Sequence, residues 1–288
     1  MPGLNTTGAP NTRDYNLGRG IVYFAKKDVT TGLPDASGFR DLGNAPEFTI
    51  TVNTEDLRHQ SSREQIKFTD ARCTISQEVA LAFQLDEMNF QNLALFFFGE
   101  TATYDNPHDT TFATTAATVS SAVVLGRWYE LRNGSGARVY NLDAAGTVYT
   151  LEEDPAGTPT TLVEGTDYEI DEKMGMVRFL PTATNVAAGE TVGFGITTGA
   201  TTAQDLDEVA AATQGDVVGV LKFVGSNACD QGQLSEYQFH SVSLASENDL
   251  SLISDEITTA NFAGVAERNA LVPDKSKVLT IRTYDQLA

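Results

Sequence analysis

The stretch FRDLGNAPEFTITVNTEDLRHQSSREQIKFTDARCTISQEVALAFQLDEMNFQNLALFFFG, residues 39–99, decides the fold. In its first part Phe48, Ile50 and Val52 alternate with polar residues, and the same period of two returns between residues 74 and 85. Such alternation is typical of a strand with one buried and one solvated face. The stretch therefore predicts two long strands and, with them, a mainly β protein.

A helix is expected directly after the second strand. From Phe90 to Phe97 the apolar residues recur at the spacing of one helix face. Asp86 can act as the N-cap, and Gly99 can end the helix in a left-handed conformation. We expect about three turns, packed on the sheet.

The segment between the two strands, Thr54–Asp70, is dense in charged and polar residues. It is long for a hairpin connection. The sequence therefore predicts either a flexible tip or a segment that finds its partner on another subunit.

Composition excludes several classes of function. The 288 residues include 39 Asp and Glu but only 19 Lys and Arg, for a formal charge of −20 and a pI near 4.4. Binding of nucleic acid through phosphate needs clustered Lys and Arg, and the sequence has no such cluster. The first residues lack the pattern of a signal peptide, and the longest apolar run, residues 93–98, is too short for a bilayer. We expect a chain that folds in a cytoplasm, without membrane contact and with Cys73 and Cys229 as free thiols.

Two stretches rich in Thr and Ala, residues 101–122 and 197–215, divide the chain. Between them, short candidate strands, among them residues 138–142, alternate with Gly and Pro turns, as in a small β-sandwich. After the second stretch longer strands return, and residues 250–253 are a further candidate strand. The parts on either side resemble each other in their pattern of long candidate strands, and neither would complete a sheet alone. We expect a discontinuous domain, residues 1–122 and 197–288, with a small β-sandwich domain inserted at residues 123–196.

No catalytic constellation is visible. The sequence lacks a phosphate-binding loop, the spacing of a zinc or calcium site and a nucleophile elbow. We therefore expect no metal, no cofactor and no enzymatic activity. A carboxylate pair for glycoside hydrolysis stays open because such residues meet only in space. Trp128, the single tryptophan, is expected to anchor the core of the inserted domain, with sugar stacking as the alternative.

Several short phrases resemble one protein family. They are LGRG (17–20) with Val22-Tyr23-Phe24, FRDLGNAPEF (39–48), the strand and helix of residues 73–99, LKFV (221–224) and LSLISDE (250–256). In this order they resemble the major tail tube proteins of long-tailed, siphophage-type bacteriophages. The resemblance covers residues 15–100 and 216–270, about half of the chain.

The resemblance implies a tail-tube β-sandwich or barrel with one flanking helix, and an inserted β-rich domain that faces outward. Six copies would form a ring, and rings would stack into a tube around a tape-measure protein and join other tail proteins. DNA would pass through the lumen during ejection without specific binding. The protein would be part of the virion tail, assembled in the host cytoplasm.

The same resemblance assigns two sets of residues. The solvated face of the two strands would line the lumen: Thr49, Thr51, Asn53, Thr74, Ser76, Glu78, Ala80, Ala82 and Gln84. The charged connection would contact a neighbouring subunit or ring: Glu55, Asp56, Arg58, His59, Arg63, Glu64 and Lys67.

Two other classes of function remain open. A secreted or surface carbohydrate-binding module would use the inserted domain and Trp128, although no signal peptide is visible. A hydrolase would use a carboxylate pair that only a structure can reveal.

Overall fold

The computed structural model describes residues 18–63, 65–106, 117–119, 123–132, 136–141, 147–153, 160–188, 192–198, 205–227 and 233–285. The chain divides into two compact units. Unit 1 comprises Met1–Thr101 and Val209–Ala288, and unit 2 comprises Ala102–Glu208. The predicted mainly β fold with one helix is confirmed.

The boundaries of the two units differ from those expected at 122/123 and 196/197. Strands β5 (Glu100–Tyr104) and β13 (Leu206–Ala210) pair with each other where the chain leaves and re-enters unit 1. Tyr104, the last residue of β5, donates its hydroxyl to the Arg138 carbonyl, and two residues later the Asn106 amide donates to the Tyr140 carbonyl. Parts of the two Thr-rich stretches thus form paired strands and hydrogen bonds, which their composition did not indicate.

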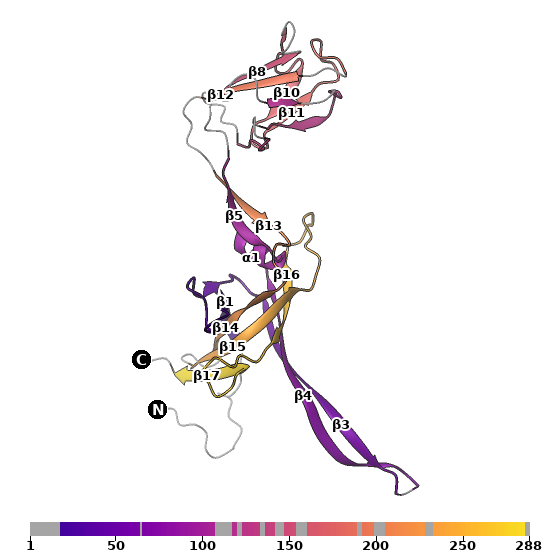
Figure 1. The fold of residues 1–288 in the computed structure, drawn as a ribbon, viewed down its shortest axis with the longest axis vertical. Helices are drawn as coiled ribbons and strands as arrows, with labels where there is room; N and C mark the ends of the chain where they lie inside the picture. The colour runs from indigo at the N-terminus through magenta and orange to yellow at the C-terminus, as the bar shows by residue number, and fades with distance from the viewer. Residues whose placement is uncertain are drawn as a thin grey trace. The chain divides into compact units, whose positions relative to one another are not determined.

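Unit 1 is built on one antiparallel sheet (Figure 1). The strands lie in the order β2 (Arg40–Asp41), β1 (Gly18–Lys26), β14 (Val217–Asn227), β15 (Gln233–Ser246), β16 (Ala260–Ala266), β4 (Phe68–Leu85) and β3 (Glu47–Ser61). An eighth strand, β17 (Leu279–Asp285), pairs with the first half of β15, while β16 pairs with its second half. The first and last thirds of the chain therefore share one sheet.

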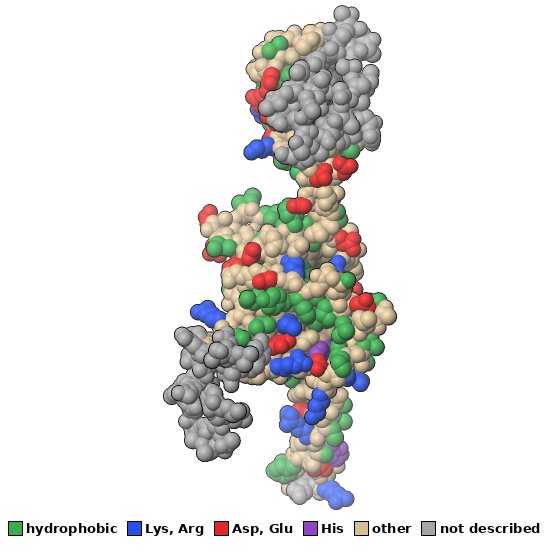
Figure 2. All heavy atoms as spheres, turned by 90° about the vertical axis from the view of Figure 1, so that its left-hand side faces the viewer, with side chains coloured by type: hydrophobic (Ala, Val, Ile, Leu, Met, Phe, Trp, Pro, Cys, Tyr) green, Lys and Arg blue, Asp and Glu red, His purple; other side chains and the backbone are tan. Residues whose placement is uncertain are grey.

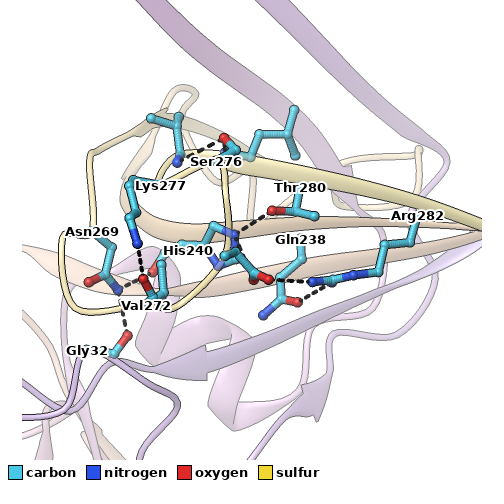
Figure 3. Close-up of polar contacts among 12 residues, drawn as sticks. Gly32, Gln238, His240, Asn269, Val272, Ser276, Lys277, Thr280 and Arg282 are labelled. Carbon is cyan, nitrogen blue, oxygen red and sulfur yellow. Dashed lines mark hydrogen bonds and ion pairs between the residues drawn. The ribbon is translucent and has the colours of Figure 1, made fainter.

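A bulge in β15 gives unit 1 a buried polar cluster (Figure 3). The register with β14 shifts between Gly219 and Leu221, so β15 carries an extra residue near His240. The His240 Nε2 atom lies 2.8 Å from Thr280 Oγ1 and 3.4 Å from Asp274 Oδ2. Burial lowers the pKa of His240 and thereby disfavours protonation of the ring.

The same cluster fixes the loop between β16 and β17. The Asn269 side chain donates to the carbonyls of Gly32 (2.6 Å) and His240 (3.0 Å), and Arg282 donates to Asp274 (2.8 Å). These bonds join three segments that are far apart in the sequence.

The helix is shorter than expected and is rotated. Helix α1 spans Phe90–Phe96, and Asn89, not Asp86, caps it by accepting from the Asn92 N–H. Asn92 is buried instead of Phe90, because its amide donates to the Leu42 and Glu87 carbonyls. The periodic apolar pattern did not register this buried polar contact.

Phe98, with φ +50°, is the left-handed residue that ends α1, in place of Gly99. The Gly99 N–H closes the cap on the Ala94 carbonyl. A side chain at Gly99 would meet the Ala210 carbonyl oxygen at 2.5 Å, so this glycine is required for close packing.

Aromatic rings connect α1 to the sheet and to β4. The Phe83 ring of β4 stacks on Phe262 of β16 with centroids 5.0 Å apart, and Phe96 of α1 meets Phe262 edge-on at 5.9 Å. Leu81 and Leu85 of β4 are buried in the same cluster. The expected packing of the apolar face of β4 together with the helix is therefore present.

One expected strand of unit 1, residues 250–253, is a loop. The Thr258 hydroxyl donates to the Ser251 carbonyl, and the Asn248 amide donates to the Thr259 carbonyl, which closes residues 247–259 on themselves. Leu252 and Ile253 are exposed, so the apolar run that favoured a strand has no covering layer.

Unit 2 contains two small sheets. One has the order β10 (Tyr168–Asp171), β11 (Met176–Phe179) and β7 (Trp128–Glu130), and the other β6 (Ala117–Val119), β12 (Val192–Thr198), β8 (Thr147–Glu153) and β9 (Thr160–Thr161). A separate buried cluster includes Leu131, Val177 and Phe179. The expected strand at residues 138–142 is reduced to a single bridge between Arg132 and Arg138 within its described part.

Asp167 organises one end of the unit 2 core. This buried carboxylate accepts five hydrogen bonds, from the Val163 N–H, from the N–H and hydroxyl of Thr184, and from the N–H and side chain of Asn185. Burial raises the pKa of Asp167, but the hydrogen bonds outweigh it and lower the pKa to about 2. Asp167 is therefore a structural anion.

Candidate functional site

The hairpin of β3 and β4 extends beyond the sheet of unit 1. β4 pairs with β16 only from Val79 to Leu85, whereas β3 accompanies β4 from Gln84 down to Phe68. Figure 1 shows the two strands continuing as a lone ribbon below the sheet. The segment 54–70, expected as a flexible tip or as a segment that finds its partner on another subunit, is largely strand, with residues 62–67 between the two strands. The strands exclude a flexible tip over most of the segment, and the partner on another subunit stays a prediction.

Cross-strand pairs explain why the charged segment is ordered. Asp56 accepts from Arg72 (2.5 Å) and from the Thr74 hydroxyl (2.8 Å), and His59 Nδ1 lies 2.5 Å from Asp70. The hydrogen bond from Arg72 lowers the pKa of Asp56, and the bond to His59 lowers that of Asp70. Solvent screens exposed pairs of this kind, so each contributes little to stability. The hairpin therefore keeps its shape with little stabilisation of its own.

The expected interface residues are spread along this ribbon. Glu55 accepts from the Ser76 hydroxyl at 3.3 Å, and the Arg63 N–H lies 3.4 Å from Ser61 Oγ. Arg58 and Lys67 are exposed, while Glu64 lies outside the described residues. Asp56 and His59 are held by partners in the hairpin, whereas Arg58 and Lys67 form no ion pair with the described residues and are exposed to another molecule.

The expected lumen face is a real face of the hairpin over most of its length. Thr49 lies opposite Ala82, Thr51 opposite Ala80, and Asn53 opposite Glu78, with Gln84 and Ser76 continuing the row on β4. These side chains are exposed or half-buried. Thr74 is different, because a bulge shifts the register after Ser76 and pairs it with Asp56. That the face lines a lumen remains a prediction.

The apolar residues of the hairpin differ between its base and its far end, where they are not confined to one face. Near the sheet, Leu81, Phe83 and Leu85 are buried, and Phe48 stacks on Phe223 at 5.0 Å. Farther out, large apolar side chains have no cover in the described chain: Val52, Leu57, Ile66, Phe68 and Ile75. Sequence analysis missed these residues as candidate interface positions because two register shifts and intervening charged residues interrupt the alternation there. The apolar hairpin end is defined here as these five residues.

Unit 2 carries a second candidate surface around Trp128, which is exposed and not the expected core anchor. Register places Glu169, Arg178 and Trp128 in one row across β10, β11 and β7. The Arg178 guanidinium lies 5.1 Å from the Trp128 ring centre and pairs with Glu169 at 2.5 Å. Tyr129, the next residue, instead faces the core beside Phe179.

Signs of other chemistry are absent from the described part of the chain. No three His, Cys, Asp or Glu side chains there are grouped to hold a metal ion. None of the helices in those ranges combines the length and apolar character needed to cross a bilayer. Cys73 in β4 is an exposed free thiol, and Cys229 lies outside the described residues.

The fold and the hairpin define a mainly β protein whose most distinctive surface is an uncovered two-stranded ribbon. The chain belongs to the family described as protein of unknown function UCP028589, whose profile matches residues 15–277. No curated protein matches the chain.

Proposed function

We propose that this protein is a structural virion protein, the major tail tube subunit of a long-tailed bacteriophage, without enzymatic activity. The observation that carries the proposal is the apolar hairpin end, which projects beyond the sheet and exposes five large side chains. A monomer gains nothing from such a surface, whereas an assembly covers it. The hairpin of one subunit would rest on a neighbouring subunit or ring.

The polar face of the same hairpin suits a conduit for DNA. The nine assigned residues are Thr, Ser, Asn, Gln and Ala with a single Glu, Glu78, and they include no Lys or Arg. Glu47 and Glu55 lie on the same face, opposite Gln84 and Ser76, and add further negative charge. Six copies of a chain with formal charge −20 carry −120. The polar face of the hairpin offers no positive charge to the phosphate groups of DNA, so DNA would slide along it without binding.

Electron microscopy and sedimentation of the purified chain at increasing concentration test the proposal. Rings that stack into tubes with an open lumen are expected, and an electrophoretic mobility shift with duplex DNA should show no binding. A chain that stays monomeric at every concentration and is missing from phage particles would refute the proposal.

A second candidate function is glycan recognition by unit 2, favoured by the exposed Trp128. An indole face beside Arg178 and Glu169 resembles the stacking and hydrogen-bonding groups that bind a sugar ring. A glycan array should then give signals that Trp128→Ala removes and Val163→Ala, a change at another exposed apolar residue of unit 2, retains. An array without signals for the unmodified chain would eliminate this candidate.

A further inference from the structure

The loop of residues 247–259, between β15 and β16, displays an unusual aliphatic surface. Leu252, Ile253 and Ile257 are 84%, 97% and 78% exposed. The loop is held in shape, since Thr258 donates to the Ser251 carbonyl (3.0 Å) and the Asn261 N–H donates to the Asn248 side chain (2.8 Å). A preformed loop loses little conformational entropy on binding. It is therefore suited to insert into another protein surface.

The loop also carries negative charge only. Glu247, Asp249, Asp255 and Glu256 lie within it, with no Lys or Arg. A partner surface should therefore combine an apolar hollow with basic groups at its rim.

Unit 1 itself has such a hollow at its β1–β2 edge. A cavity of about 610 Å³ is lined by apolar groups that include Phe24, Phe39 and Leu95, with Lys26 and Arg40 beside them. Within the described residues neither cation forms an ion pair with a carboxylate, although Asp41 interacts electrostatically with Arg40 and Arg40 donates to the Asn92 side chain at 2.6 Å. Glu100 also lines the cavity, where it accepts from Gln214 (3.0 Å). Figure 2, which faces the side of the molecule that carries β1, shows Lys and Arg side chains next to hydrophobic ones.

The loop and the hollow belong to opposite parts of the sheet. The hollow lies between α1 with residues 99–101 and the strands β1 and β2, which stand at one end of the strand order. The loop leads into β16, next to β4 and β3 at the other end. A contact between two different surfaces of identical chains is head-to-tail, and its repetition closes a ring or continues a filament.

We propose that the 247–259 loop of one copy inserts its three aliphatic side chains into the β1–β2 hollow of the next copy, with Asp255 and Glu256 facing Lys26 and Arg40. The occupant is a second copy of this chain because both halves of the contact, apolar and charged, are present on one molecule. The inference rests on the proposed function, since it names the contact within each ring.

Two variants that each remove one half of the contact provide the test. Leu252→Asp with Ile253→Asp disables the loop, and Gln91→Trp fills the hollow from the exposed face of α1. Each variant keeps the half that the other lacks. Fluorescence-detected sedimentation should therefore show the two binding each other at least tenfold more tightly than either binds itself. Hairpin contacts are common to all three pairings, so they cancel in this comparison.

Equal affinity in the three pairings would overturn the inference. A charge exchange gives a second measurement that does not depend on the bulky Gln91→Trp: Lys26→Glu and Asp255→Lys should each weaken association at low salt, and their combination should restore it. Val29→Asp, at an exposed apolar site outside both surfaces, should associate like the unmodified chain.

The outcomes separate this inference from the proposed function. If the unmodified chain never associates, the tail tube proposal fails. If the unmodified chain forms rings and the loop variant forms them equally well, only the loop contact is refuted. If the loop instead binds a different tail protein, the inference that its partner is a second copy of this chain is refuted.

Discussion

Replacement of Leu57, Phe68 and Ile75 by serine should abolish stacking of the protein without unfolding it. These three residues of the apolar hairpin end are 61%, 59% and 60% exposed in the isolated chain. Their removal therefore takes little from the folded monomer, and the melting temperature should stay within a few degrees of that of the unmodified chain. Their contribution should appear only when a neighbour covers them.

The size of the effect follows from these exposed fractions. Burial of a whole Leu, Ile or Phe side chain contributes about 1.5–3 kcal/mol, so covering the remaining three-fifths contributes about 1–2 kcal/mol for each residue. The three together amount to about 3–5 kcal/mol for each contact, or about 10²–10⁴-fold in the association constant.

Sedimentation equilibrium measures this change directly, with circular dichroism to verify folding. A matched control replaces Val29 and Leu271, exposed apolar residues of unit 1 outside the hairpin, by serine. The control should associate normally. The reasoning would be refuted if the hairpin variant assembled at the same concentration as the unmodified chain, or if the control lost assembly equally.

Three further predictions concern stability, and a fourth concerns the division into units. Phe262→Ala removes a buried ring that contacts both β4 and α1, so the free energy of unfolding should fall by about 3–5 kcal/mol in urea denaturation. Burial lowers the pKa of His240, so as the pH drops below about 6.5 this side chain takes up a proton more readily in the unfolded state, and the melting temperature should fall. His240→Gln should flatten the dependence of the melting temperature on pH. An unchanged dependence would contradict the lowered pKa of His240. Asp167→Asn should lower the free energy of unfolding by about 3 kcal/mol at neutral pH, because one oxygen that accepts hydrogen bonds is replaced by an NH₂ group that donates them. In the unmodified chain the pKa of Asp167 is about 2, so the stabilisation by this carboxylate should persist above pH 4 and be lost only as the pH falls towards 2. Replacement of residues 105–205 by a short Gly-Ser bridge should leave unit 1 folded with a single cooperative transition; loss of its β circular dichroism would show that unit 1 needs unit 2.

Alternation in the sequence predicted the part of the hairpin that packs against the sheet. There one face is uniformly apolar, as in Phe48 and Phe83, so the period of two is unambiguous. Beyond Asn53 the same strands carry charges that pair across the hairpin, such as Asp56 with Arg72. A single sequence does not reveal which charges face each other, so ordered strands resemble a polar loop.

Other differences arise from long-range contacts. The register of α1 depends on Asn92, whose partners include a carbonyl 50 residues earlier in the chain. Trp128 lies on the outer face of its strand because Tyr129 fills the core position next to it. The residue types alone favoured the opposite environments, and contacts with residues about 50 positions away, Leu42 for Asn92 and Phe179 for Tyr129, determine the observed ones.

The order of strands in the sheet also determines when each strand can pair during synthesis of the chain. Tyr23 of β1 pairs with Lys222 of β14, and Val79 of β4 pairs with Ala266 of β16, so the first strands wait for partners translated after the whole of unit 2. The hairpin itself closes locally, yet its base cannot be fixed until the last quarter of the chain has left the ribosome. Such late, non-local pairing slows folding and leaves apolar surface open to misassembly. A truncated product would therefore carry the apolar hairpin end without the sheet that orients it. Complete translation would then be the step that separates assembly of the proposed tube from aggregation.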